Sequence, residues 1–198
     1  MQKKRSEEVG KVRDKYRKRI SQVTMKNDSK GATYNLGLVL ETRERLNLTD
    51  AQVDSVVSAA QQIKALQKSG EITKEKNNRW EYERTYIMQI LDEAQLGDFL
   101  AIRNYDYALS VAQRPWKEMR QYDVAFEYDS VATVRQIIVY QLNKNRLQYI
   151  YKGNDAMLKE MEDYLYRTAY PPALKQLRVA KQQRNNNQEA TEQNELIF

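Results

Sequence analysis

The chain has 198 residues, with 33 Lys and Arg against 27 Asp and Glu, and it contains neither His nor Cys. Without these two residue types, transition-metal sites lose their usual ligands and nucleophilic triads lose their base, so we expect no metal, no cofactor and no enzymatic activity. Only 6 Gly and 3 Pro interrupt a sequence rich in helix-forming polar residues, which predicts an all-α protein of long or bundled helices and helical hairpins.

Most of the net charge lies in residues 1–30, which we call the basic arm. This segment holds 11 Lys and Arg against 4 Asp and Glu, whereas residues 31–198 hold 22 against 23. A thin apolar stripe beside a broad cationic face predicts a helix, whose candidate binding residues are Lys11, Lys15, Lys18 and Arg19. Three roles stay open: a solvated helix, attraction of acidic or unfolded proteins, and contact with anionic lipid or nucleic acid. Nucleic acid is unlikely, because neither aromatic platforms nor a reading element lies nearby.

Residues 31–114 form a second predicted region, which begins with a helix over residues 34–46. Residues 46–53 then carry the pattern of a helix start. The side chain of Thr49 can accept a hydrogen bond from the backbone of Gln52, whose own side chain can reach back to the backbone of Thr49. Leu48 and Val53 hold the two positions of a hydrophobic staple. The new helix is expected to end at Gly70.

The same pattern returns at residues 90–96. A helix predicted to begin at Thr73 ends near Leu91, where Asp92 and Gln95 can form a second capping box. Leu91 and Leu96 complete its staple. The two starts suggest a weak repeat of helical hairpins. We interpret the polar residues of both boxes as architectural, so their substitution should lower stability before it changes binding.

Residues 115–180 form a third predicted region that is also helical. Pro115 predicts a boundary or a kink, and residues 117–150 then read as one helix or two. Residues 137–140 have strand propensity, but their helical flanks favour a helix. A further helix over residues 156–169 is terminated by Tyr170, Pro171 and Pro172. Residues 181–198 are rich in Gln, Asn and Glu, and this composition predicts a disordered tail.

The first helix start, Leu46-Asn47-Leu48-Thr49-Asp50-Ala51-Gln52, resembles the LTxxQ motif of the Spy/CpxP family of bacterial periplasmic proteins. Residues 90–95, with Phe99 beyond them, resemble the second copy of the motif that such proteins carry. The resemblance covers about residues 46–103. Asp92 stands where the family pattern has Thr, and the C-terminal half is unmatched.

This resemblance implies a non-enzymatic chaperone-like or envelope-stress binding protein. In that family a curved helical dimer presents a basic, partly apolar concave face to unfolded clients or to a sensor partner. A homodimer and an unfolded or partner protein are therefore the expected partners. The alternative that the residues leave open is a helical structural or interaction protein, whose C-terminal half binds one defined partner. The 14 Tyr either fill helix interfaces or line such a surface.

The sequence also bears on location. No run approaches the roughly 18 apolar residues that span a bilayer, and the N-terminus lacks the apolar region of a signal peptide. The family resemblance nevertheless implies a periplasmic or otherwise exported protein whose signal peptide has been removed. A cytoplasmic location is the alternative.

Overall fold

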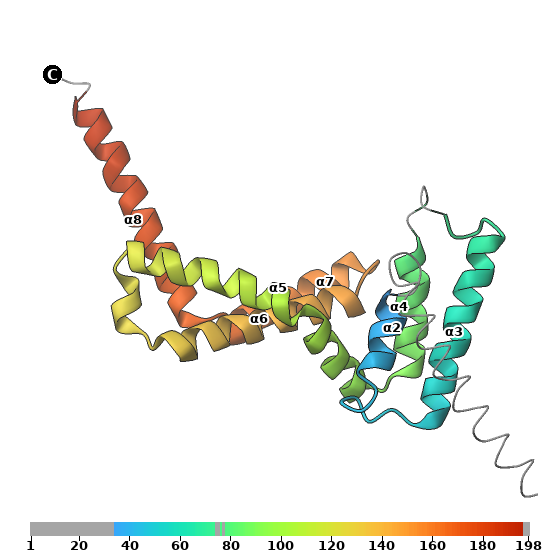
Figure 1. The fold of residues 1–198 in the computed structure, drawn as a ribbon. Helices are drawn as coiled ribbons and strands as arrows, with labels where there is room; N and C mark the ends of the chain where they lie inside the picture. The colour runs from blue at the N-terminus through green and yellow to red at the C-terminus, as the bar shows by residue number, and fades with distance from the viewer. Residues whose placement is uncertain (1–33, 74–75, 77, 196–198) are drawn as a thin grey trace, which may run out of the picture. The chain divides into compact units, whose positions relative to one another are not determined.

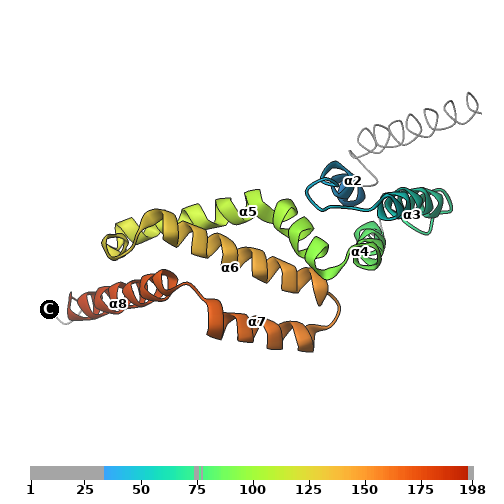
Figure 2. The same cartoon turned by 90° about the horizontal axis from the view of Figure 1, so that it is seen from below.

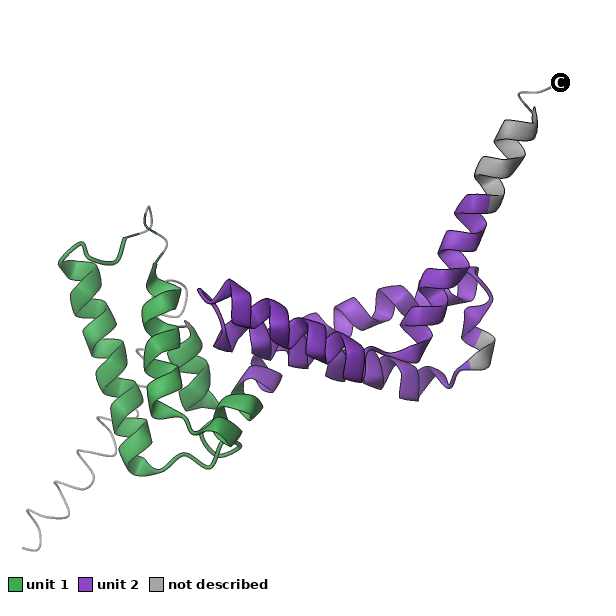
Figure 3. Cartoon of the chain, turned by 180° about the vertical axis from the view of Figure 1, so that it is seen from behind, with its two compact units in different colours: residues 1–99 green, residues 100–198 purple. Residues whose placement is uncertain are grey.

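The computed structural model describes residues 34–73, 76 and 78–195, with only the backbone of residues 34, 126–127 and 187–195. These described residues are helical and include no strand, which confirms the predicted all-α class (Figure 1). The basic arm, with Lys11, Lys15, Lys18 and Arg19, lies outside them. The chain divides into two compact units, residues 1–99 and residues 100–198 (Figure 3).

The described part of the first unit contains three helices and the start of a fourth. These are α2 (Tyr34–Glu41), α3 (Asp50–Lys68), α4 (Arg79–Ile90) and the beginning of α5 (Glu93–Gln121). The apolar residues of α3 recur every three or four positions, so they form one face that packs against the other helices. The fully buried side chains of this unit include Leu36, Val39, Val56, Ile63, Ile87 and Phe99.

Helix α2 is shorter than the predicted helix over residues 34–46. Its regular part ends at Glu41, and residues 42–47 continue as turns. Asn47 has a left-handed backbone, with φ of 49°, and the N–H of Leu48 reaches back to the carbonyl of Arg43. A left-handed residue stops a helix because its backbone no longer directs hydrogen bonds along the axis.

The end of α3 matches its prediction. Gly70 has φ of 77°, its N–H donates to the carbonyl of Gln67, and the N–H of Glu71 donates to that of Leu66. These two bonds define a Schellman motif, in which glycine accepts the left-handed backbone without a Cβ clash. The predicted start of the next helix at Thr73 is wrong. Thr73 Oγ1 does accept the N–H of Lys76, but α4 begins only at Arg79.

The second unit contains the rest of α5, the 3-10 helix η1 (Val124–Glu127), α6 (Ser130–Ile150), α7 (Asp155–Ala169) and α8 (Pro172–Glu195) (Figure 2). Its core consists of two separate apolar clusters. The first joins α5 to α6 through Ala108, Ala112, Ile137 and Ile138. The second joins the end of α5 to η1 and the start of α8 through Met119, Val124, Ala173 and Leu177.

Helix α5 continues through Pro115, so the boundary expected there is absent. Proline removes one intrahelical donor and clashes one turn back, at a cost of about 3 kcal/mol. Ala112 on one side and Met119 on the other are both fully buried, one in each apolar cluster. Packing on both sides of Pro115 therefore favours a continuous helix.

The remaining predicted boundaries agree with the structure. Residues 137–140 lie in α6, and Gly153, with φ of 85°, precedes α7, which is capped by Asn154. Pro172 opens α8. The backbone of α8 is described to Glu195, and residues 196–198 of the predicted tail lie outside the described residues. Gln, Glu, Ala, Lys and Arg in α8 are good helix formers, which accounts for the helical backbone.

Candidate functional site

The first helix start forms the predicted capping box. The N–H of Gln52 donates to Thr49 Oγ1 over 3.2 Å, and the N–H of Thr49 donates to Gln52 Oε1 over 3.0 Å. Leu48 is half-buried and Val53 is buried, as a hydrophobic staple requires. Two backbone donors that the helix cannot satisfy internally are thus satisfied locally.

The second helix start has the same local geometry. The N–H of Gln95 donates to Asp92 Oδ1 over 2.8 Å, and the N–H of Asp92 donates to Gln95 Oε1 over 3.1 Å. Leu91 and Leu96 are both buried. Asp92 therefore caps this helix, although the family pattern has Thr at the position.

The structure joins the two helix starts through their glutamines. Gln52 Nε2 donates to Gln95 Oε1 over 2.6 Å, and Gln95 Nε2 donates to Gln52 Oε1 over 3.2 Å. The second hydrogen of each amide binds a backbone carbonyl next to the opposite start, that of Ile90 for Gln52 and that of Leu46 for Gln95. We call this reciprocal pair the glutamine clasp. Every amide hydrogen and both amide oxygens in it are used.

The sequence predicts each box but not the contact between them. The available signal was the alignment of the two copies, which places Gln52 opposite Gln95 in a repeat of helical hairpins. A residue shared by two copies of a motif can serve the contact between copies as well as its own helix. The glutamines therefore both cap helices and connect residues far apart in the chain.

A second polar connection in the first unit is absent from the sequence predictions. The Glu83 side chain is 1% exposed, and its two oxygens bind different partners. Arg79 Nε and Nη2 donate to Glu83 Oε1, while the Asn35 backbone N–H and Nδ2 donate to Glu83 Oε2. This carboxylate thus links α2 to α4. Nothing in an isolated Arg-x-x-x-Glu spacing distinguishes this buried pair from an exposed one.

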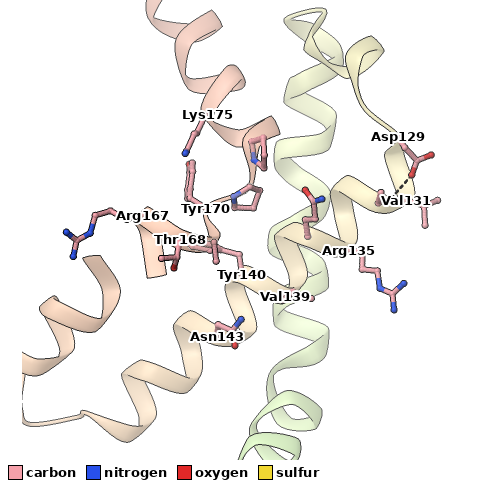
Figure 4. Close-up of a pocket in the computed structure, with 15 residues that line it drawn as sticks. Asp129, Val131, Arg135, Val139, Tyr140, Asn143, Arg167, Thr168, Tyr170 and Lys175 are labelled. Carbon is pink, nitrogen blue, oxygen red and sulfur yellow. Dashed lines mark hydrogen bonds between the residues drawn. The ribbon is translucent and has the colours of Figure 1, made fainter. Parts of the chain in front are cut away.

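An open groove lies in the second unit, between α6 and the segment that joins α7 to α8 (Figure 4). Its volume is about 770 Å³. One face of α6 forms one wall, and the end of α7 with the start of α8 forms the other. Its lining includes Val131, Arg135 and Val139 of α6 on one side and Arg167, Tyr170 and Lys175 on the other. No pattern in the sequence predicts this groove, because its walls come from separate helices that meet only in the folded chain.

Aromatic side chains line the middle of the groove. The rings of Tyr140 and Tyr170 meet edge to face, with centroids 5.3 Å apart, and the Tyr166 ring lies 4.7 Å from that of Tyr170. Burial raises the pKa of both Tyr140 and Tyr170 above the usual value for tyrosine. Their hydroxyls therefore stay protonated at neutral pH, and each can donate a hydrogen bond to a ligand.

Two features are absent from the described residues. None of their helices combines the length and the apolar character needed to cross a membrane. Among the same residues, no group of three or more Asp or Glu side chains is arranged to hold a metal ion. The groove and the glutamine clasp are thus the features from which a function can be argued.

Comparison of the chain with protein-family models, curated protein sequences and solved structures finds no match. The resemblance to the Spy/CpxP family therefore depends on the sequence of the two helix starts alone.

Proposed function

We propose that this protein is a non-enzymatic, chaperone-like or envelope-stress binding protein of the periplasm, similar in role to Spy and CpxP. The observation that supports the proposal most directly is the glutamine clasp. Gln52 and Gln95 are the glutamines of the two LTxxQ-like copies, and they hydrogen-bond to each other as well as to their own helix starts. Each box closes by itself, but the contact between the glutamines needs two copies of the motif, and the resemblance implies two copies in that family.

The exposed surface of the second unit supports the same proposal. Large apolar side chains stand exposed there, and several are Tyr or Met, which adapt to different partners because they combine flexible or amphipathic contact area with little directional demand. A surface of this kind suits weak binding of many sequences more than a single rigid fit. The exposed members within the described part of this unit are Tyr105, Tyr107, Val131, Val139, Met157, Tyr164, Tyr166 and Val179.

Suppression of aggregation tests the chaperone-like function. A chemically denatured model client is diluted into buffer with and without the full chain, and light scattering is followed at low and at moderate ionic strength. We expect protection near a stoichiometric ratio that weakens as salt increases, because salt screens the attraction by exposed basic residues. An absence of protection at stoichiometric excess would contradict the proposal.

The contribution of the basic arm can be separated from that of net charge. A variant with Lys11, Lys15, Lys18 and Arg19 changed to Gln should lose most of the salt-dependent protection. The matched control changes four exposed basic residues of the described part to Gln: Arg43, Arg45, Lys117 and Lys159. Both variants lose the same charge, so equal loss of protection would assign the effect to net charge instead of the arm.

A second function, binding of one defined partner by the C-terminal half, is favoured by the groove between α6 and α8. A shaped, positively charged groove selects among ligands in a way that scattered exposed side chains do not. Isolation of a single stoichiometric partner with the full chain would support this function. In that case the two helix starts serve only to build the first unit.

A further inference from the structure

The α6 wall of the groove presents an alternating stripe. Val131, Arg135 and Val139 are four residues apart, so they follow one another along one face of the helix at about 6 Å intervals. Val131 is 75% exposed and Val139 is 51% exposed, which is unusual for β-branched apolar residues. The stripe therefore offers two apolar contacts with a cation between them.

The opposite wall adds positive charge. Arg167 from the end of α7 and Lys175 from α8 line it, and in Figure 4 they lie across from the residues of α6. Asp129 is the carboxylate among the lining residues, and its Oδ1 already accepts the N–H of Ala132 as the N-cap of α6. In the described part of the chain neither Arg135 nor Lys175 forms an ion pair. The groove thus carries an excess of cations that can bind carboxylates.

The length of the groove suits a short extended segment. The lining residues of α6 and its N-cap run from Asp129 to Asn143, which covers about 21 Å at 1.5 Å per residue. An extended chain rises about 3.4 Å per residue, so about six of its residues span that length.

Hydrogen-bonding groups suited to an extended backbone are also present. Gln136 and Asn143 line the groove two helical turns apart, and both side chains are exposed. An amide side chain can both donate to a peptide carbonyl and accept from a peptide N–H. The hydroxyls of Tyr140 and Tyr170, which also line the groove, add one donor each. An extended ligand would therefore not leave its backbone polar groups unsatisfied.

We propose that this groove binds an extended acidic segment of a partner protein, with the pattern apolar, any residue, Asp or Glu, any residue, apolar. Alternate side chains of an extended chain point the same way and are about 6.7 Å apart, close to the spacing of the Val131, Arg135 and Val139 stripe. The central carboxylate then meets Arg135, and carboxylates on the other side of the ligand meet Arg167 and Lys175. The inference rests on the second proposed function and specifies its partner.

Fluorescence anisotropy with short labelled peptides tests the inference on the full chain. The probe has a Val-Ser-Glu-Ser-Val centre with a further Glu at each side, and matched peptides carry Gln or Lys in place of every Glu. We expect saturable binding of the acidic probe, at least tenfold weaker binding of the Gln peptide and none of the Lys peptide.

Protein variants test the groove itself. Arg135→Glu should weaken binding of the acidic probe at least tenfold, and Val139→Ser should weaken it severalfold. Lys159→Glu, the same charge change at an exposed α7 position outside the groove, should leave binding unchanged.

Three outcomes would overturn the inference: equal binding of the Glu and Gln peptides, no binding of any peptide, or equal loss in Arg135→Glu and Lys159→Glu. The peptide comparison needs no protein variant, so misfolding cannot obscure it. Failure here is distinct from failure of the proposed functions. Capture of one defined partner that is unaffected by Arg135→Glu would keep the second function and remove the groove from it. Aggregation suppression is measured separately and tests only the first function.

Discussion

The two units of the chain both have apolar cores but differ in their polar contacts. In the first unit, buried or partly buried polar side chains also connect distant segments: Glu83 links α2 to α4, and the glutamine clasp links the two helix starts. In the second unit, two separate apolar clusters join the helices, and the described residues of α7 include none that is buried. Most large exposed apolar side chains of the described residues also belong to this unit.

This difference suggests different roles for the two units. Buried hydrogen-bond networks are specific in geometry and costly to break, so the first unit has little freedom to rearrange. An amphipathic helix without buried residues, beside an open groove, leaves apolar and cationic surface for a ligand. The first unit is therefore the scaffold in our interpretation, and the second carries the binding surface.

The largest expected difference between the two units is in the stability contributed by two Arg–Glu pairs with the same four-residue spacing. Arg79 pairs with Glu83, whose side chain is 1% exposed, while Arg114 pairs with Glu118 and is itself 85% exposed. Arg79→Ala leaves a buried carboxylate without its cation and should cost about 3 kcal/mol or more. Arg114→Ala should cost less than about 0.5 kcal/mol. Urea unfolding followed by circular dichroism measures both, and similar losses would refute the proposed difference between the units.

The glutamine clasp gives the next largest effect. Gln52→Ala and Gln95→Ala should each lower the free energy of unfolding by about 2 kcal/mol, because each leaves partly buried carbonyls and N–H groups without partners. The double variant should be less destabilised than the sum by about 1 kcal/mol, which is the coupling of residues in direct contact. Gln61→Ala, an exposed position on α3, is the control and should be nearly neutral. Additive losses would mean that each glutamine serves only its own helix start.

The sequence predicts local features of this fold but not the contacts between distant segments. Local signals predicted the all-α class, the caps at Thr49 and Asp92 and the stop at Gly70, because each depends on neighbours within a few residues. The pairing of Gln52 with Gln95 depends on where two distant segments meet in the folded chain, and no local pattern encodes that.

Neither the burial of Glu83 nor the groove could be predicted from local sequence, for the same reason. Glu83 and Glu118 have identical spacing from an arginine, yet only the tertiary environment buries the first. Of the boundary or kink predicted at Pro115, the boundary is absent, because packing at Ala112 and Met119 favours a continuous α5. The groove requires α6, α7 and α8 to fold back on one another, so its residues appear unrelated in the sequence.

A smaller effect is expected for the connection between α5 and α8. Glu118 accepts hydrogen bonds from Lys181 and Arg114, and chiefly the bond from Lys181 lowers the pKa of this carboxyl. A lowered folded-state pKa stabilises the fold above the unfolded-state value of about 4.3, and the contribution is lost as pH falls through the folded value. The pair is partly exposed, so the contribution should be below about 1 kcal/mol. Lys181→Ala should therefore destabilise the chain at pH 6 and have almost no effect near pH 2, as measured by urea midpoints.

The smallest effect on stability is expected from truncation of the chain near the end of α8. The last described contacts of the helix with the rest of the unit come from Lys181, which pairs with Glu118, and Arg184, whose guanidinium lies 5.4 Å from the Tyr122 ring. Truncation after Asn186 keeps both, so the melting temperature should change by less than about 1 °C. Truncation after Val179 removes both and should lower the melting temperature measurably.

The truncation after Asn186 also tests the helical state of the end of α8. If the helical backbone to Glu195 persists in solution, this truncation lowers the helical signal in circular dichroism. If the composition dominates, as the sequence predicts, the total helical signal stays constant, because a segment with so few apolar side chains cannot offset the entropy of ordering it.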